Sequence, residues 1–432
     1  MKASTENGGG QLEMMSQSLG VISARGRRCS ISAAYDTLKL RSCIWNREIR
    51  NLYCFADNLV YTARFPGNLY QFMVFKLKGS RTLGHAIDSH ENGFNLVRLL
   101  CALLVVLYHA FQLNPIAPGP DPLSRLTAPH ADLGSIAVGV FFIISGLFIT
   151  QSWMRDPHLA RFALRRIARI VPGLFVCLLV TTAWAVAFHS SDGFKGMLKS
   201  EPWRFILGGS VLHWLQYVIP PAELRIPGVL SGQDLNGPLW TLYWEGRMYV
   251  MVALVGLAAM MPMRVWMRGA AVFLLLAANL FPDVLSGWVW EVRMWSLFLV
   301  GMLLTTLAPH VRIGLVHVFC ALALAGLNWT RQMATTGTGL TWFAIALIMG
   351  AVALWLGSAR YDSMRHLRSH DYSFGIYIYH WPVLLMVRAA WPPTDALTLL
   401  GVSLLVIIPL AMLSWHLVEA PAQRVARRLL KR

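Results

Sequence analysis

The feature that most constrains this chain is the apolar stretch at residues 94–113, FNLVRLLCALLVVLYHAFQL. A helix needs about 20 residues to cross the ~30 Å hydrocarbon core of a bilayer, and this stretch is that long. Two ionisable residues, Arg98 and His109, lie inside it. Because a charged group inside a bilayer is costly, such residues usually have a function. The stretch therefore predicts a transmembrane helix that carries part of a site.

The spacing of these two residues places them relative to each other. Arg98 and His109 are eleven residues apart. At about 100° and 1.5 Å per residue, a helix returns to nearly the same face over that distance and advances about 16 Å. We therefore expect both side chains on one face at two depths. The structural alternative is that Arg98 extends to the lipid headgroups and His109 packs against a neighbouring carbonyl group.

Apolar stretches of similar length continue along the chain. Of the 432 residues, 56% are hydrophobic and 14% are charged, whereas soluble domains carry about 25% charged residues. We expect an all-α polytopic membrane protein with about ten transmembrane helices. The expected spans are residues 94–113, 134–153, 170–189, 239–260, 265–281, 288–307, 313–329, 338–357, 372–391 and 396–417. The interrupted apolar segment 203–219 is expected to be an interfacial or re-entrant helix.

The basic residues indicate how these spans are oriented. The net charge is +17, but the arginines lie in short loops between apolar stretches, which is the positive-inside pattern and not a nucleic-acid-binding face. With a cytosolic N-terminus, sixteen Lys and Arg residues face inward and six face outward. We therefore expect both termini in the cytosol and a multi-pass protein of the inner (plasma) membrane.

The chain divides by composition into three parts. Residues 1–84 contain no apolar stretch long enough to span a membrane, and we expect a poorly ordered cytosolic extension that is dispensable for catalysis. Residues 85–425 form the transmembrane domain, and residues 426–432 form a basic cytosolic tail. The six cysteines form no CxxC motif and no Cys/His pair with metal spacing. We therefore predict neither a disulfide framework nor a metal site.

A cluster of arginines opens the third expected span on its cytosolic side, in RFALRRIARIVP. Arg165, Arg166 and Arg169 fall within about one helical turn. Guanidinium groups suit phosphate recognition because their donors match two oxygens at once. The cluster therefore predicts an anion-binding site at the membrane surface. The alternative is simple anchoring of the span by the positive-inside rule.

A carboxylate lies inside the fourth expected span, in LWTLYWEGRMYV. Glu245 falls about 10 Å below the outer surface, at a depth similar to that of His109, with Tyr249 on the same helix face. A buried carboxylate needs a partner, and a His109–Glu245 pair could act as an acid/base unit. The alternative is a structural ion pair of Glu245 with Arg247 or Arg293.

Two further stretches hold polar residues within apolar spans. Ser145 and Gly146 lie in GVFFIISGLFIT, where a Ser-Gly pair permits close approach of helix backbones. No base stands at useful spacing to make Ser145 a nucleophile, so close packing is favoured. His380 lies in YSFGIYIYHWPV, two residues before Pro382, which is expected to kink the helix. Aromatic packing at the interface is the alternative to a role for His380 in the site.

Taken together, these stretches resemble the acyltransferase 3 family of integral membrane acyltransferases over about residues 85–425. The matching residues are Arg98 and His109; Phe141, Phe142, Ser145 and Gly146; Arg165, Arg166, Arg169, Ile170 and Pro172; Leu239, Trp240, Thr241, Leu242, Glu245 and Tyr249; His380 and Pro382; and Glu419 and Pro421. The chain departs from the family pattern at Asn95, at Leu147-Phe148 and at Met248. Unlike the fused members of the family, this chain is expected to have no hydrolase-like domain after the last span.

The resemblance implies a membrane O-acyltransferase. Such an enzyme moves an acyl group, commonly acetyl, from cytosolic acyl-coenzyme A to a carbohydrate hydroxyl, as on an exopolysaccharide, O-antigen or lipid-linked glycan. Arg165, Arg166 and Arg169 would hold the coenzyme phosphates, and Arg98 would guide the pantetheine arm. His109 would act as general base or carry the acyl group, oriented by Glu245. Substrate-binding roles would fall to Ser145, Tyr249 and His380.

A membrane transporter is the competing class. Buried Arg, His and Glu residues also suit a proton-coupled exporter. The chain shows no internal repeat of the kind that many transporters have, and the cytosolic arginine cluster favours the enzyme. The expected partners are acyl-coenzyme A, a carbohydrate acceptor and the bilayer, with no nucleic acid; the sequence indicates no oligomeric state.

Overall fold

The structure is a computed structural model. It describes residues 82–89, 92–114, 119–127, 131–211, 234–258, 289–312, 314, 338–359, 370–391 and 395–431, all within the compact unit Leu77–Arg432. The expected span 265–281, and the expected span 313–329 apart from residue 314, lie outside the described residues. The same holds for residues 1–81 of the expected N-terminal extension and for part of the segment 203–219.

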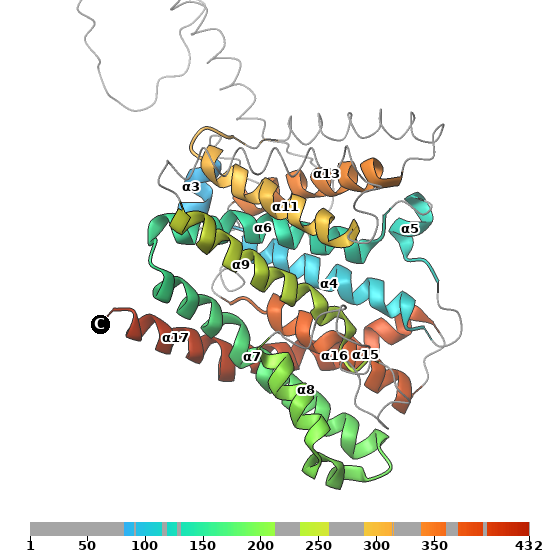
Figure 1. Cartoon of the computed structure of the whole chain (residues 1–432). Helices are drawn as coiled ribbons and strands as arrows, with labels where there is room; N and C mark the ends of the chain where they lie inside the picture. Colours follow the sequence, from blue (N-terminus) through green and yellow to red (C-terminus); the bar gives the residue numbers. More distant parts are fainter. Residues whose placement is uncertain are drawn as a thin grey trace, which may run out of the picture. The chain divides into compact units, whose positions relative to one another are not determined.

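The described part of the chain is all helical (Figure 1). It contains no strand, and its one isolated bridge joins Thr82 and Arg312. The helices are α3 (Leu83–Asp88), α4 (Phe94–Gln112), α5 (Pro122–Thr127), α6 (Leu133–Arg155), α7 (Leu159–His189), α8 (Ser200–Ser210), α9 (Trp240–Ala258), α11 (Val289–Leu307), α13 (Thr338–Ser358), α15 (Ser373–Ala390), α16 (Ala396–Ser414) and α17 (Ala420–Leu429). Short 3-10 helices lie at Gly193–Leu198 and Gly237–Leu239, and a π-helical turn, Trp415–Glu419, joins α16 to α17.

Membrane character is confirmed by the length and composition of these helices. Four of those described are long and apolar enough to cross a bilayer: Phe94–Gln112, Leu133–Arg155, Leu159–His189 and Ala396–Leu429. Shorter apolar helices lie at Arg293–Leu307 and Ile345–Ser358. Ten spans, and the orientation of the termini, stay predictions.

Helix α7 begins well before its expected start at residue 170. It runs from Leu159 to His189 and keeps Pro172 inside. Arginine, alanine and leucine, which fill its first turns, are strong helix formers, so the basic segment continues the spanning helix outward instead of forming a loop. The arginine cluster is therefore held on a rigid element that leads directly into the membrane.

Helix α6 lies at the centre of the described helices. It packs against α4, α9, α11 and α13, and 72% of its most apolar stretch is buried, against 28% for Ala396–Leu429. A helix that is apolar on all sides is expected in the interior, surrounded by other helices. Residues on α6 therefore face several neighbours, and one of its sides can contribute to a site formed with α4, α7, α9 and α15.

The predicted close packing at Ser145-Gly146 is confirmed at the contact of α6 with α11. A methyl group added to Gly146 would overlap the carbonyl oxygen of Phe298, and one added to Gly301 would overlap that of Ile143. Glycine at both positions therefore lets the two backbones touch, as small residues do between membrane helices.

We expect Gly146→Ala to destabilise the folded protein by about 1–3 kcal/mol, because the added methyl group meets backbone that has to shift. The measurement is the thermal unfolding temperature of the detergent-solubilised protein. Gly401→Ala on α16 is the matched control, since a methyl group there would meet nothing within 4 Å. Equal unfolding temperatures for the two variants would contradict a tight α6–α11 contact.

Candidate active site

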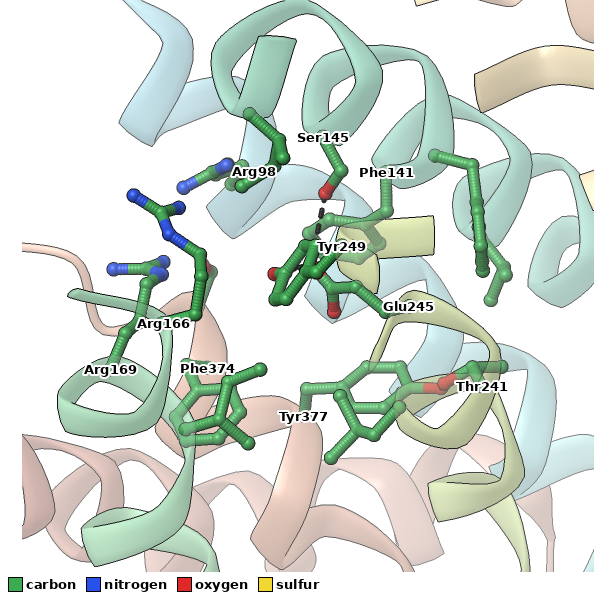
Figure 2. A pocket seen from close by; sticks show the side chains of 16 residues that line it. Arg98, Phe141, Ser145, Arg166, Arg169, Thr241, Glu245, Tyr249, Phe374 and Tyr377 are labelled. Atoms are coloured by element: carbon green, nitrogen blue, oxygen red, sulfur yellow. Dashed lines mark hydrogen bonds between the residues drawn. The ribbon is translucent and has the colours of Figure 1, made fainter. Parts of the chain in front are cut away.

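A pocket of about 80 Å³ lies where α4, α6, α7, α9 and α15 meet (Figure 2). Six sequence-predicted site residues line it: Arg98, Ser145, Arg166, Arg169, Glu245 and Tyr249. Phe141, Phe374 and Tyr377 supply much of its aromatic wall. The structure therefore brings together, in one pocket, residues spread over 150 positions of the sequence. Of the nine predicted site residues, Arg165, His109 and His380 do not line it.

Three guanidinium groups converge at one end of this pocket, at the left of Figure 2. Arg98 comes from α4, whereas Arg166 and Arg169 come from consecutive turns of α7. The Nε atom of Arg166 is buried and has no hydrogen-bond partner among the described residues, while its Nη2 lies 3.4 Å from the hydroxyl of Ser152. Arg166 thus brings hydrogen-bond donors and a positive charge to the pocket without a paired carboxylate in the described part of the chain.

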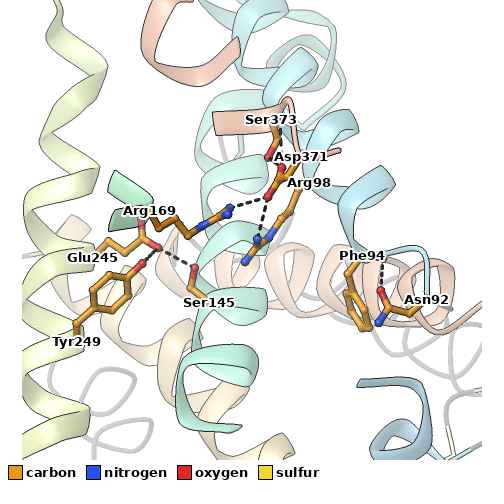
Figure 3. A network of polar contacts seen from close by, with 9 residues as sticks. All are labelled: Asn92, Phe94, Arg98, Ser145, Arg169, Glu245, Tyr249, Asp371 and Ser373. Atoms are coloured by element: carbon orange, nitrogen blue, oxygen red, sulfur yellow. Dashed lines mark hydrogen bonds and ion pairs between the residues drawn. The ribbon is translucent and has the colours of Figure 1, made fainter. Parts of the chain in front are cut away.

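Asp371 joins the other two arginines and was not predicted from the sequence (Figure 3). Its Oδ2 accepts hydrogen bonds from Arg98 Nη1 at 3.3 Å and from Arg169 Nη2 at 2.6 Å. Its Oδ1 accepts from the Ser373 hydroxyl at 2.5 Å and from the Ser373 backbone N–H at 3.3 Å. These contacts fix the carboxylate just before α15. An acidic residue directly ahead of an apolar span was the signal that could have identified it, because buried arginines need a counter-charge.

The electrostatics of Asp371 follow from these contacts. Burial alone would raise the pKa of this carboxyl, but Arg169, Arg98 and the Ser373 hydroxyl outweigh burial and hold the pKa well below its usual range. Asp371 is therefore ionised at neutral pH. Its single charge is shared between two guanidinium groups, so the arginine cluster keeps an excess of positive charge.

Glu245 is held by two hydroxyl groups (Figure 3). The Ser145 hydroxyl donates to Glu245 Oε1 at 3.1 Å, and the Tyr249 hydroxyl donates to the same oxygen. The alternative ion pair with Arg247 is not formed, because the Arg247 guanidinium lies over the rings of Tyr243 and Trp244, at 4.4 and 4.8 Å from their centroids. Glu245 is thus a fixed hydrogen-bond acceptor on the pocket wall.

His109 contacts His380 and not the predicted Glu245. His109 Nδ1 lies 2.9 Å from His380 Nε2, and the two rings stack with centroids 5.0 Å apart. The structure contains no direct hydrogen bond between His109 and Glu245. The reason is lateral position: a similar depth does not make neighbours of two residues, and His109 faces α15 whereas Glu245 faces α6.

His380 is fully buried and uses both ring nitrogens. Its Nδ1 lies 2.6 Å from the Tyr377 carbonyl oxygen, which lies one turn earlier on α15. Pro382 lacks an N–H, so the Ile378 carbonyl four residues earlier has no helical donor. That carbonyl accepts instead from Asn236 Nδ2 at 2.8 Å and from the Cys177 thiol at 3.2 Å. The segment around His380 is therefore a specific polar contact region as well as an aromatic packing surface.

Arg165 points away from the pocket, unlike its two neighbours in the cluster. Its Nη1 lies 2.8 Å from Asp156 Oδ2, beside the 2.8 Å ion pair of Arg161 with the other oxygen. The hydrogen bond from Arg165 and the charge of Arg161 lower the pKa of Asp156. The two ion pairs of Asp156 lie at the turn between α6 and α7. In the part of the chain that the structure describes, no group of His, Cys, Asp and Glu residues could hold a metal ion.

Comparison with known proteins agrees with this site. A family model described as an acyltransferase domain, of acyltransferase 3 type, matches residues 91–416. Nodulation protein 10 of Rhizobium leguminosarum bv. viciae is 27% identical over 79% of this chain and 97% of its own length. The O-acetyl transferase of Shigella phage Sf6 is 25% identical over 76% and 95%.

Similarity to a third protein is shorter. The peptidoglycan O-acetyltransferase OatA of Listeria monocytogenes is 25% identical over 36% of this chain and 22% of its own length. No solved structure matched the chain. The family match covers most of the chain and includes every residue of the pocket, so the protein is an acyltransferase that belongs to the acyltransferase 3 family.

Proposed function

We propose that this chain transfers an acetyl group from acetyl-coenzyme A to a hydroxyl of a carbohydrate, within a multi-pass arrangement in the inner (plasma) membrane. The observation that carries the proposal is the convergence of Arg98, Arg166 and Arg169 at one end of a pocket that lies between apolar helices. Phosphate-bearing donors are recognised by such clusters, because guanidinium groups form charge-assisted and often paired hydrogen bonds to phosphate oxygens.

The pocket size supports a donor that enters end first. A volume of about 80 Å³ is well below the roughly 300–1,000 Å³ of pockets that enclose whole ligands. It accommodates an acyl group with its thioester, while the nucleotide end stays at the mouth. The aromatic wall of Phe141, Phe374 and Tyr377 suits this apolar end of the donor.

A carbohydrate hydroxyl is proposed as the acceptor because His109 can act as a base and because of the names of the relatives. One relative is named as a peptidoglycan O-acetyltransferase, and peptidoglycan carries its hydroxyl groups on sugars. In the proposed step His109 takes the hydroxyl proton, the hydroxyl oxygen bonds to the acyl carbon, and the carbon–sulfur bond breaks. The proton then passes from His109 to the leaving thiolate, which gives an ester and a free thiol.

The function is tested with the purified full chain in lipid nanodiscs. Isotope-labelled acetyl-coenzyme A is supplied with a panel of carbohydrates that includes peptidoglycan fragments, and labelled ester is measured by mass spectrometry. Label on a carbohydrate, removable by mild alkali, is the expected result. Specific binding of acetyl-coenzyme A without any labelled product would support acetyl-coenzyme A as the donor and reject the carbohydrate acceptors tried. Absence of binding would reject the donor.

Arg166→Ala is expected to weaken acetyl-coenzyme A binding about 10- to 100-fold, because one lost charge-assisted hydrogen bond costs about 1.5–3 kcal/mol. Titration calorimetry measures the dissociation constant. S-acetyl-pantetheine lacks the nucleotide phosphates, so its affinity should change little. Arg161→Ala is the matched control on α7, since Arg161 pairs with Asp156 outside the pocket. Equal affinity of wild type and Arg166→Ala would favour membrane anchoring as the role of this arginine.

A further inference from the structure

The contact between His109 and His380 restricts which of their ring nitrogens can carry hydrogen. Both nitrogens of His380 are within hydrogen-bond distance of a partner: Nδ1 lies 2.6 Å from the Tyr377 carbonyl oxygen and Nε2 lies 2.9 Å from His109 Nδ1. His380 has no exposed surface. Its ring therefore exchanges hydrogen bonds with these two neighbours and not with bulk water.

The Tyr377 carbonyl decides the proton position on His380. A carbonyl oxygen can only accept a hydrogen bond, so His380 Nδ1 has to carry the hydrogen. A neutral imidazole has one N–H, which leaves a lone pair on His380 Nε2. That lone pair can accept only if His109 Nδ1 is the donor. In a neutral His109 the hydrogen is then on Nδ1, and the lone pair is on Nε2, across the ring.

The neutral form of the pair is supported by its surroundings. A buried charge without a paired counter-charge is strongly disfavoured. In the described part of the chain no carboxylate hydrogen bonds to either ring, and Glu245 and Asp371 are both engaged elsewhere. An imidazolium on His380 would also place two positive rings in contact once His109 took up a proton.

We propose that His380 is a positioning residue that holds His109 in the tautomer with hydrogen on Nδ1, so that His109 Nε2 is the base. The inference deepens the proposed function, on which it rests. When the acceptor hydroxyl gives its proton to His109 Nε2, His109 Nδ1–H keeps donating to His380 Nε2, and no proton has to leave His380. The charge formed on His109 is then stabilised by a fixed lone pair.

The same arrangement accounts for the choice of partner. In serine hydrolases a carboxylate orients the catalytic histidine through its Nδ1–H. Inside a membrane a carboxylate in that position would be costly whenever the histidine is neutral. A neutral imidazole, itself fixed by a backbone carbonyl, orients the ring without adding a charge.

The test combines a proton measurement with matched variants of the full chain in nanodiscs. Nitrogen-15 NMR of histidine-labelled protein distinguishes the two tautomers of each ring, and the His109 signals are assigned from His109→Ala. His380→Phe keeps an aromatic ring but cannot accept a hydrogen bond. His380→Gln carries an amide oxygen that can accept from His109 Nδ1–H. His189→Phe, at the end of α7, is the control for loss of a histidine outside the site.

The expected result is a His109 signal with hydrogen on Nδ1 in wild type and in His380→Gln, and a mixture of tautomers in His380→Phe. With the acetyl transfer assay, His380→Phe should lower kcat about 100-fold, at the lower end of general-base contributions, with KM for acetyl-coenzyme A unchanged. His380→Gln should restore most of the activity, and His189→Phe should resemble wild type.

Two outcomes would overturn the inference. The first is a wild-type His109 with hydrogen on Nε2, which is read from the resting protein without any substrate. The second is a His380→Phe protein that folds and transfers acetyl at the wild-type rate. If the tautomer is as expected but wild type transfers no acetyl group, the His380 assignment is supported and the proposed function is what fails.

Discussion

His109→Ala abolishes acetyl transfer while the protein still inserts into the membrane and binds acetyl-coenzyme A. This is the expected result because His109 is the proposed base, whereas the arginines proposed to bind the donor are other residues, on α4 and α7. Loss of a general base lowers turnover about 10²- to 10⁴-fold, which places the variant near the detection limit. The measurement is labelled ester formed per enzyme, beside donor affinity by calorimetry.

His189→Ala is the matched control, since His189 lies at the end of α7 against Trp184 and outside the pocket. Near-normal product formation by His109→Ala would reject the assignment of the base. A parallel loss of donor binding would instead place His109 in the donor site.

Asp371→Asn is expected to destabilise the protein by about 3 kcal/mol, the lower end of the cost of removing one partner from a buried ion pair. The asparagine keeps the shape of the side chain but removes the charge that balances Arg98 and Arg169. The Asp371 side chain is only 5% exposed, so water does not replace the lost interaction. Thermal and denaturant unfolding in detergent measure the change.

The pH dependence of this effect follows from the sign of the shift. A carboxyl whose pKa is lowered on folding stabilises the protein at pH values above its unfolded pKa, about 3.9, and loses this contribution as the pH falls further. The stability gap between wild type and Asp371→Asn should therefore be constant between about pH 5 and pH 8. Asp156→Asn is the control, because its pairs with Arg161 and Arg165 lie near the surface and such pairs contribute about 0–1 kcal/mol. Equal stability of wild type and Asp371→Asn would contradict the role given to this carboxylate.

Local pattern was sufficient for much of the fold. Apolar stretches of spanning length predicted α4, α6, α16 and the apolar part of α7, and the Ser-Gly pair predicted the close contact that Gly146 makes with α11. The start of α7 was missed because basic residues were taken to mark a loop. The positions of basic residues indicate where a span leaves the membrane. Helix formation depends instead on the helix propensity of each residue, so a helix can continue past that boundary.

Part of the site was also predictable. Polar residues in or beside apolar spans were selected from the sequence, and six of them line one pocket: Arg98, Ser145, Arg166, Arg169, Glu245 and Tyr249. Burial of such groups is costly enough that they gather where they can satisfy one another. Arg165 was grouped with Arg166 although residues one position apart on a helix point about 100° apart, and the structure pairs Arg165 with Asp156 outside the pocket.

The amino-acid sequence by itself determined which segments are long and apolar enough to cross a membrane. It also determined which residues share a helix face, because rise and twist per residue are the same in every α-helix. The tertiary structure alone decided which faces meet. It placed His109 against His380 instead of Glu245, and it brought Asp371, 202 positions from Arg169, between two arginines. Those contacts depend on the lateral order and rotation of the helices, which are set by packing across the whole interior and not by the residues of any one helix.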